Sequence, residues 1–188
     1  MAKIQLRPHT LLCPVPAVMV SCGTADGRQN IITIAWAGTV CSDPPMLSIA
    51  VRPLRYSYQM IADTGEFVVN IPSSKLLKAL DYCGVVSGRD VDKFAQCGLT
   101  AAPASQLHYA PLIAECPLNL ECEVEQELML GSHALFLARI VAVQADESVL
   151  DAKHLIDHQL AQPIAYAGSN YYELGTLLGR HGFSRSER

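Results

Sequence analysis

The chain has 188 residues, of which half are apolar and only 17% are charged, so it can bury a substantial core. Its formal net charge of -4 gives no electrostatic basis for binding nucleic acid, because phosphate backbones attract basic surfaces. Any anionic ligand must therefore be held by a local cluster of donors.

The first ten residues contain basic side chains and no continuous apolar stretch, so we expect neither a signal peptide nor a membrane anchor. The apolar runs elsewhere are too short and too interrupted to span a bilayer. Seven cysteines are present without a Cys-x-x-Cys pair, which argues against a metal site and against a disulfide framework. These features predict a cytoplasmic protein with reduced thiols.

Two apolar runs, Ala17–Cys22 and Asn30–Val40, flank an Asp-Gly pair, which is a strong hairpin signal. We expect the second run to be one strand that is buried on both faces. The following ranges also have the composition and spacing of strands: Met46–Val51, Glu66–Ile71, Leu118–Leu130 and Ala134–Val143.

Apolar residues at helical spacing predict three short helices in the connections. Their ranges are Tyr56–Ala62, Ser73 or Ser74 to Asp81, and Asp90–Cys97 with Gly98 as the stop. Strands joined mostly by hairpins favour a closed or partly open antiparallel barrel over a parallel doubly wound sheet. After Asp151 the sequence loses strand character, and we expect Ser184–Arg188 to fray.

The familiar nucleotide and hydrolase motifs are absent from this sequence. It has no Gly-x-Gly-x-x-Gly fingerprint, no P-loop, no His-Glu-x-x-His and no Gly-x-Ser-x-Gly. A dinucleotide held by a Rossmann unit is therefore disfavoured, as is hydrolytic chemistry.

Basic and hydroxyl side chains converge where the strand Met46–Val51 ends and a helix begins. Arg52, Arg55 and Ser57 lie within six residues of one another. A phosphate is bound by guanidinium groups, hydroxyl donors and the free N–H groups of a helix N-terminus. The alternative interpretation is a solvated turn whose arginines serve solubility.

The segment Cys83–Phe94 is a second candidate. Gly84 and Gly88 allow the main chain to approach a ligand closely, and Ser87 and Lys93 add donors. An ordinary loop between two helices explains the same composition equally well.

Two aromatic side chains complete the candidates. Trp36 is the only tryptophan, and small residues flank it, so it is suited to form the wall of a site for a flat ring. From the residues alone, a core-filling role is the preferred alternative. His133 follows a Gly-Ser turn and could face the mouth of the barrel, or could simply be hydrogen-bonded within the turn.

A set of short motifs occurs in order over about residues 14 to 145. They are Asn30-x-x-Thr33-x-Ala35-Trp36, Asp43-Pro44-Pro45, Ser48-Ile49-Ala50-Val51, Arg55-x-Ser57, Glu66-Phe67-Val68-Val69-Asn70-Ile71-Pro72, Cys83-Gly84-x-x-Ser87-Gly88-x-x-x-Asp92-Lys93-Phe94 and Gly131-Ser132-His133-x-Leu135-Phe136. In this order they resemble the flavin reductase-like family, and within it the flavoredoxin-like and ferric-reductase-like branch. The C-terminal run from Tyr171 to Phe183 also resembles the C-termini of flavoredoxins.

The resemblance implies a mainly β fold, the FMN-binding split β-barrel, which is antiparallel and Greek-key-like with short connecting helices. It implies one domain over residues 1–188, with a core at about 14–145 and a C-terminal extension at 146–188. It further implies a homodimer with one FMN per subunit near the interface.

The resemblance also assigns roles to the candidate residues. It implies that the strand around Trp36 lines the flavin ring, that the turn around Arg55 meets the phosphate, and that the segment around Ser87 closes over the cofactor. No catalytic residue is certain, and His133 is a candidate for contact with nicotinamide or substrate. The implied cofactor-binding residues are Thr33, Ala35, Trp36, Arg52, Arg55, Tyr56, Ser57, Cys83, Gly84, Ser87 and Lys93.

The implied function is an oxidoreductase that passes electrons from NADH or NADPH through FMN to a flavin, iron or another small-molecule acceptor. A flavin performs the redox chemistry itself, which is consistent with the absence of a catalytic constellation. Two alternatives stay open: a flavoredoxin-type carrier that exchanges electrons with a partner protein, and a member of the fold without flavin.

Overall fold

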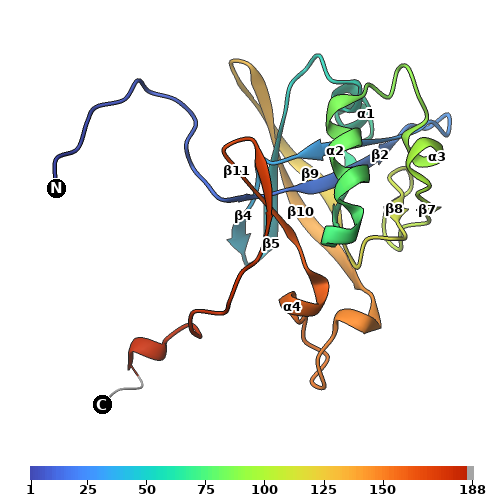
Figure 1. The fold of residues 1–188 in the computed structure, drawn as a ribbon. Coiled ribbons are helices and arrows are strands. Elements are labelled where there is room, and N and C mark those ends of the chain that lie inside the picture. Colours follow the sequence, from blue (N-terminus) through green and yellow to red (C-terminus); the bar gives the residue numbers. More distant parts are fainter. Residues whose placement is uncertain (186–188) are drawn as a thin grey trace.

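A seven-stranded antiparallel sheet forms the centre of the structure, a computed structural model that describes residues 1–185 (Figure 1). The strand order is β3-β2-β6-β9-β10-β5-β4. In chain order these strands are β2 (Val18–Gly23), β3 (Gln29–Ile34), β4 (Ala37–Ser42), β5 (Pro45–Val51), β6 (Glu66–Ile71), β9 (Leu118–Leu130) and β10 (His133–Ala145).

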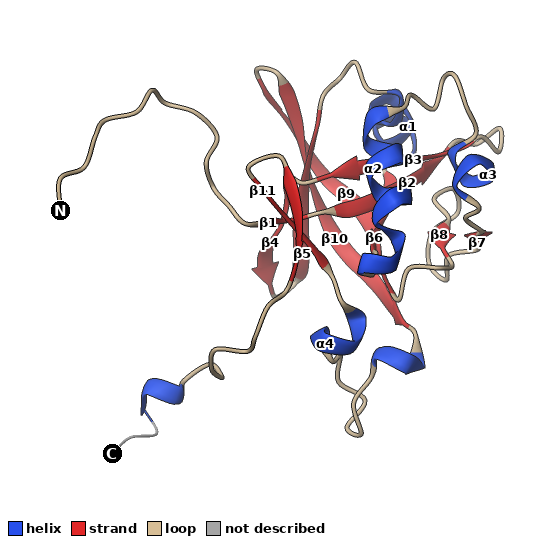
Figure 2. Ribbon diagram, in the orientation of Figure 1, coloured by secondary structure: helices blue, strands red, loops and turns tan. Residues whose placement is uncertain are grey.

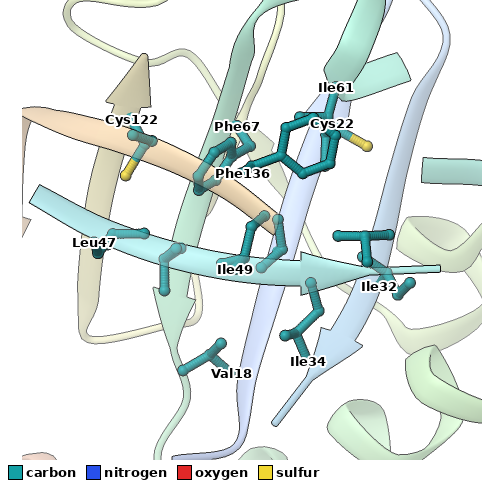
Figure 3. Packing of buried hydrophobic residues seen from close by; sticks show 14 of the residues in the cluster. Val18, Cys22, Ile32, Ile34, Leu47, Ile49, Ile61, Phe67, Cys122 and Phe136 are labelled. Atoms are coloured by element: carbon teal, nitrogen blue, oxygen red, sulfur yellow. The ribbon is translucent and has the colours of Figure 1, made fainter. Parts of the chain in front are cut away.

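The sheet curls so that strands from its two ends share one core. Ile32 and Ile34 of β3 belong to the same buried cluster as Leu47 and Ile49 of β5, and Figure 3 shows them together with Phe136. The edge strands β3 and β4 are nevertheless not paired with each other. The result is an antiparallel barrel that is open along one line.

One predicted strand is wrong. The range Asn30–Val40 forms two strands, β3 and β4, and the chain bends between them at Ala35 and Trp36. The carbonyl of Trp36 accepts a hydrogen bond of 2.9 Å from the main chain of Ala50, which directs the chain to the opposite end of the sheet. Only β3 is buried on most of its length, whereas β4 is largely exposed.

The other predicted strands are confirmed to within two residues. The 13-residue strands β9 and β10 form the longest hairpin, and Gly131 provides the positive φ of 67° that its turn needs. His133 is the first residue of β10 and pairs with Leu130. It therefore lies at the end of the sheet where β5 finishes, since Ala134 pairs with Val51.

Two helices, α1 (Tyr56–Thr64) and α2 (Leu77–Val85), pack against β2 and β3 (Figure 2). The helix α2 ends four residues later than predicted, so Cys83 and Gly84 lie in its last turn and not in a loop.

The third predicted helix is shorter than expected. The helix α3 (Lys93–Cys97) begins only after Asp92, whose side chain caps it by accepting from the main chain of Ala95 at 3.2 Å. Gly98 ends the helix with a φ of 63°, as predicted. Residues 86–92 are therefore a connecting loop between α2 and α3.

The prediction that strand character ends after Asp151 is also wrong. The strands β11 (Ile164–Ala167) and β12 (Asn170–Glu173) form a hairpin that pairs with β1 (Val15–Pro16). Gly168 and Ser169 both have positive φ, which is typical of the tight turn of a two-residue hairpin. The remaining elements are small: the strand pair β7 (Ala101–Ala102) and β8 (Leu112–Ile113), and the helix α4 (His158–Ala161).

The two ends of the chain run away from the body of the molecule, as Figure 1 shows. The predicted fraying concerns Ser184–Arg188; its first two residues lie in a short 3-10 turn, and residues 186–188 lie outside the described part of the chain. Among residues 1–185, no helix is both long enough and apolar enough to cross a membrane.

Candidate functional site

A continuous groove lies between β3, the turn after β5 and the end of α2. It consists of a wide cavity of about 360 Å³ and a narrow cavity of about 200 Å³. Ile32, Arg55 and Gly84 line both cavities, so the two open into each other. An elongated ligand could therefore occupy both.

All twelve residues that the sequence predicts for the site line this groove. The wide cavity contains those predicted to meet a flat ring, and the narrow cavity contains most of those predicted to meet a phosphate. Thr33, Ala35, Trp36, Arg52 and His133 line the wide cavity, Tyr56, Ser57, Cys83, Ser87 and Lys93 line the narrow one, and Arg55 and Gly84 line both.

The groove concentrates positive charge in a chain that is acidic as a whole. Arg52, Arg55, Arg89 and Lys93 line it, and no aspartate or glutamate does. Over residues 1–185, the ion pairs involve only Arg28 and Arg139, so no carboxylate neutralises the four cations of the groove. Such a concentration of one sign of charge attracts an anion.

Lys93 lies at the bottom of the narrow cavity and is only 4% exposed. Its ammonium donates to the carbonyls of Ile31 and Cys83 at 2.7 and 2.8 Å. Because an ammonium has three N–H donors, one remains for a ligand. Burial lowers the pKa of Lys93, and a bound anion would counteract that effect by favouring the charged form.

The N-terminus of α1 adds hydrogen-bond donors to the narrow cavity. Arg55 precedes the helix, and its side chain accepts no hydrogen bond from the first N–H groups of the helix. These N–H groups therefore have no capping side chain. The buried hydroxyl of Ser57 accepts from the amide of Asn30 at 2.8 Å and keeps its own O–H as a donor. Asn30 also lines the narrow cavity, and the sequence analysis included it in a motif but did not name it as a site residue.

The outer wall of the narrow cavity is built from Tyr56 and Arg89. The guanidinium carbon of Arg89 lies 5.4 Å from the centre of the Tyr56 ring, a cation–π contact. Arg89 also donates to the carbonyl of Leu54 at 3.2 Å, and Arg28 donates to the Tyr56 hydroxyl at the same distance. Arg89 was missed, although it directly follows the predicted Ser87-Gly88 pair.

Trp36 forms part of the wall of the wide cavity. Its side chain is 44% exposed, so the interpretation of Trp36 as a core-filling residue is wrong. Its ring centre lies 4.5 Å from that of His133, with the planes tilted by 42°. A flat ligand entering the cavity would meet this aromatic pair.

His133 is held in one orientation by two partners. Arg52 donates to its Nε2 at 3.4 Å, and the Ser132 hydroxyl lies 2.9 Å from its Nδ1. An Nε2 that accepts requires the hydrogen on Nδ1, which gives a neutral ring. Burial, followed by the positive charge of Arg52, lowers the pKa of His133, which favours the neutral ring.

The glycines of the segment Cys83–Phe94 line the groove and also allow close packing within the protein. A Cβ at Gly84 would lie 3.2 Å from the Cβ of Thr33, and a Cβ at Gly88 would overlap the amide of Asn30. Glycine at these two positions therefore lets α2 and its loop approach β3 closely, and the close approach of main chain to a ligand stays a prediction. The Thr33 hydroxyl reinforces this packing by donating to the carbonyl of Leu80.

The C-terminal hairpin contributes two residues that the sequence analysis missed. Tyr166 and Tyr171 line the wide cavity, with ring centres 5.4 Å apart. The Tyr171 hydroxyl donates to Asp81 of α2 at 3.0 Å, which fixes the hairpin against the helix. The signal that could have revealed them is the Gly168-Ser169 turn between two short apolar stretches.

The described residues contain no group of three or more histidine, cysteine or acidic side chains placed to hold a metal ion. The aromatic lining of the wide cavity and the cationic lining of the narrow one have the chemistry that suits an organic anion.

Comparisons with known proteins place this chain in a family. A sequence model described as the flavin reductase like domain matches residues 10–175. The structure of a flavoredoxin of Desulfovibrio vulgaris (Miyazaki F) has a TM-score of 0.90 and 34% identity, covering 96% of this chain and 98% of that one. The structure of a flavoredoxin from Methanosarcina acetivorans has a TM-score of 0.90 and 30% identity, and the match covers 97% of this chain and 96% of that one.

A protein of Archaeoglobus fulgidus is 31% identical over 144 residues, which is 77% of this chain and 80% of that one. The family match spans the whole groove, from β2 to the C-terminal hairpin. The chain belongs to the flavin reductase-like family, and its open antiparallel barrel is the split barrel of that family.

Proposed function

We propose that this protein binds FMN in the groove and acts as an oxidoreductase through it. The observation that carries the proposal is the continuity of an aromatic cavity with a cationic one that lacks any carboxylate. FMN has the matching shape, since a flat ring and a phosphate stand at its two ends. Membership of the flavin reductase-like family supports a flavin as the cofactor.

The residues present fit such a ligand. In the narrow cavity, Arg55, Arg89, Lys93, the Ser57 hydroxyl and the first N–H groups of α1 would hold the phosphate. Tyr56 and Arg89 border this cavity, and the cation–π contact between them and the hydrogen bond of Arg89 to Leu54 hold this part of its lining in place.

The wide cavity would hold the ring between several elements. Thr33, Ala35 and Trp36 form one wall and the two tyrosines of the C-terminal hairpin form another. When bound, the flavin supplies the redox chemistry by accepting a hydride and passing electrons on. Arg52, held beside His133, places a positive charge where negative charge on the ring would be stabilised.

His133 is our candidate for contact with nicotinamide or substrate. It is neutral, it is oriented by Arg52 and Ser132, and its ring borders the open wide cavity. The chain needs no further acid or nucleophile for hydride transfer, because the flavin itself carries out that chemistry.

The leading form of the proposal is an NAD(P)H-dependent reductase that reduces a flavin, iron or another acceptor. The visible spectrum of the purified protein tests the cofactor first: flavin bands are expected, and HPLC of the released chromophore should identify FMN. A colourless protein that also fails to take up added FMN would instead support a member of the fold without flavin.

Anaerobic mixing with NADH or NADPH then tests the donor. Rapid bleaching of the bound flavin by one of them is the expected result for a reductase. The electron carrier is the second candidate, because two solved structures that share 34% and 30% identity with this chain are named flavoredoxins. Bleaching by neither nucleotide, together with fast reduction by a partner protein, would favour the carrier.

We also propose that the protein works as a homodimer. The extended N-terminal segment exposes Leu11 and Leu12, and the tip of the β9–β10 hairpin exposes Leu128, Met129 and Leu130. Apolar side chains gathered on extended segments are typical of surfaces that a partner covers. A second copy of the chain is the simplest such partner.

A further inference from the structure

A pair of thiols lies behind the narrow cavity, on the two helices that flank its closing loop. Cys83 belongs to the last turn of α2, and Cys97 is the last residue of α3. Their sulfur atoms are 3.9 Å apart. A disulfide needs a separation of about 2.05 Å, so a movement of about 2 Å would join them.

The segment between the two cysteines carries part of the groove. It contains Ser87 and Arg89 on the loop and Lys93 at the start of α3. The ammonium of Lys93 donates to the carbonyl of Cys83 itself at 2.8 Å. A bond between the two sulfurs would therefore tie the ends of the segment that closes the narrow cavity.

The two thiols differ in access to solvent. Cys83 is fully buried, whereas Cys97 is partly exposed. Burial and then the neighbouring Cys97 raise the pKa of Cys83 to about 12, so Cys83 remains a thiol at neutral pH. Cys13 and Cys41 also reach the surface, but the described structure gives neither a sulfur neighbour.

We propose that Cys83 and Cys97 form a reversible dithiol–disulfide pair that hydrogen peroxide oxidises. Cys97 reacts first: its sulfur takes one oxygen from peroxide and becomes a sulfenic acid, and one water is released. The sulfur of Cys83 then displaces the hydroxyl group from Cys97, and this group leaves with the proton of Cys83 as a second water. Two electrons pass from the two thiols to peroxide.

This inference rests on the proposed function for its source of peroxide, because a reduced flavin in contact with oxygen releases hydrogen peroxide. The closure of the disulfide does not rest on that function. Adding peroxide directly to the protein therefore tests the thiol pair even if no flavin is bound.

Peptide mapping is the direct test. The purified protein is treated with hydrogen peroxide, free thiols are blocked, and trypsin then cuts after Lys78, Arg89, Lys93 and Arg139. Cys83 and Cys97 fall in different peptides, residues 79–89 and 94–139. The expected product is a disulfide-linked pair of these peptides that dithiothreitol separates.

The second peptide also contains Cys116 and Cys122, so fragment masses must assign the linked sulfur. The link should be at Cys97, should vanish in Cys97→Ser and should persist in the control Cys41→Ser. The disulfide should also raise the thermal midpoint of the wild type by about 5 °C, reversibly. Oxidation of Cys97 without a link, or a link to Cys116 or Cys122, would overturn the proposal.

Discussion

Single polar groups in the groove are each held by the protein on one side and face the cavity on the other. The ammonium of Lys93 donates two hydrogen bonds to main-chain carbonyls. The Ser57 hydroxyl accepts a hydrogen bond from Asn30, and its own O–H stays available. Such groups are oriented before a ligand arrives, so binding costs less conformational entropy. The same holds for His133, which Arg52 and Ser132 hold in place.

Trp36 offers an optical test of the ring position. It is the only tryptophan and it forms part of the wall of the wide cavity, so a flavin bound there should quench its emission. Removal of the flavin should restore the signal, which a fluorescence titration with FMN would follow. Unchanged emission at saturating FMN would place the ring elsewhere.

His133 should titrate below the usual range of histidine. Burial, followed by the positive charge of Arg52, lowers its pKa from 6.5 by disfavouring the protonated ring. NMR titration of the imidazole signals should therefore show a pKa under 6.5. Because the depressed pKa means that the unfolded chain binds the proton more readily, this residue's contribution to stability falls as pH drops below 6.5.

The variant Arg52→Gln separates the two causes. It removes the charge and leaves a side chain of similar length, so the pKa of His133 should rise part of the way back. A pKa that stays equally low in this variant would show that burial acts alone, and it would contradict the contact between Arg52 and Nε2.

At the scale of elements, local patterns predicted most strands but not how the chain bends between them. The run Asn30–Val40 bends at Ala35 and Trp36, and neither residue is a glycine or proline that would signal a bend. At this bend the carbonyl of Trp36 accepts a hydrogen bond from the main chain of Ala50. That bond belongs to the pairing of β4 with β5, so the composition of the run Asn30–Val40 alone does not reveal it.

The C-terminal hairpin was missed for a different reason. Its strands have only four residues each, and their stability comes from pairing with β1 and from the contact of Tyr171 with Asp81. The groove residues on predicted turns and strands were found because their chemistry is visible in the sequence. Tyr166 and Asn30 line the groove only because of how the chain folds, and the sequence analysis did not name them as site residues.

The approach of the α2–α3 loop to β3 gives a prediction at this scale. A side chain at Gly88 would overlap the amide of Asn30, which in turn holds Ser57. Gly88→Ala should therefore destabilise the fold by about 1–3 kcal/mol and weaken FMN binding as well.

Urea unfolding and an FMN titration would measure both effects. Gly38→Ala is the matched control, because nothing lies within 4 Å of a Cβ at that position. If the two variants behaved alike, the close approach of the loop to Asn30 would not matter for the site.

At the scale of the whole molecule, the apolar side chains exposed on the N-terminal segment and on the tip of the β9–β10 hairpin predict a homodimer. Light scattering after size-exclusion chromatography should give the mass of two 20.4 kDa chains. Leu128→Lys and Leu130→Lys together should shift the protein toward the monomer, because they place charges on the exposed apolar tip. A monomeric wild type would contradict the proposed homodimer.

The central claim is that the cationic end of the groove holds the phosphate of FMN. The most direct test compares the affinities of FMN and riboflavin, which lacks the phosphate, for the flavin-free protein. Hydrogen bonds to charged groups are worth about 1.5–3 kcal/mol each, so FMN should bind at least roughly 100-fold more tightly. The double variant Arg55→Ala, Ser57→Ala should lose most of that difference and remain folded, whereas Arg139→Ala on β10 should retain it. Equal affinity of the wild type for the two flavins would contradict the account.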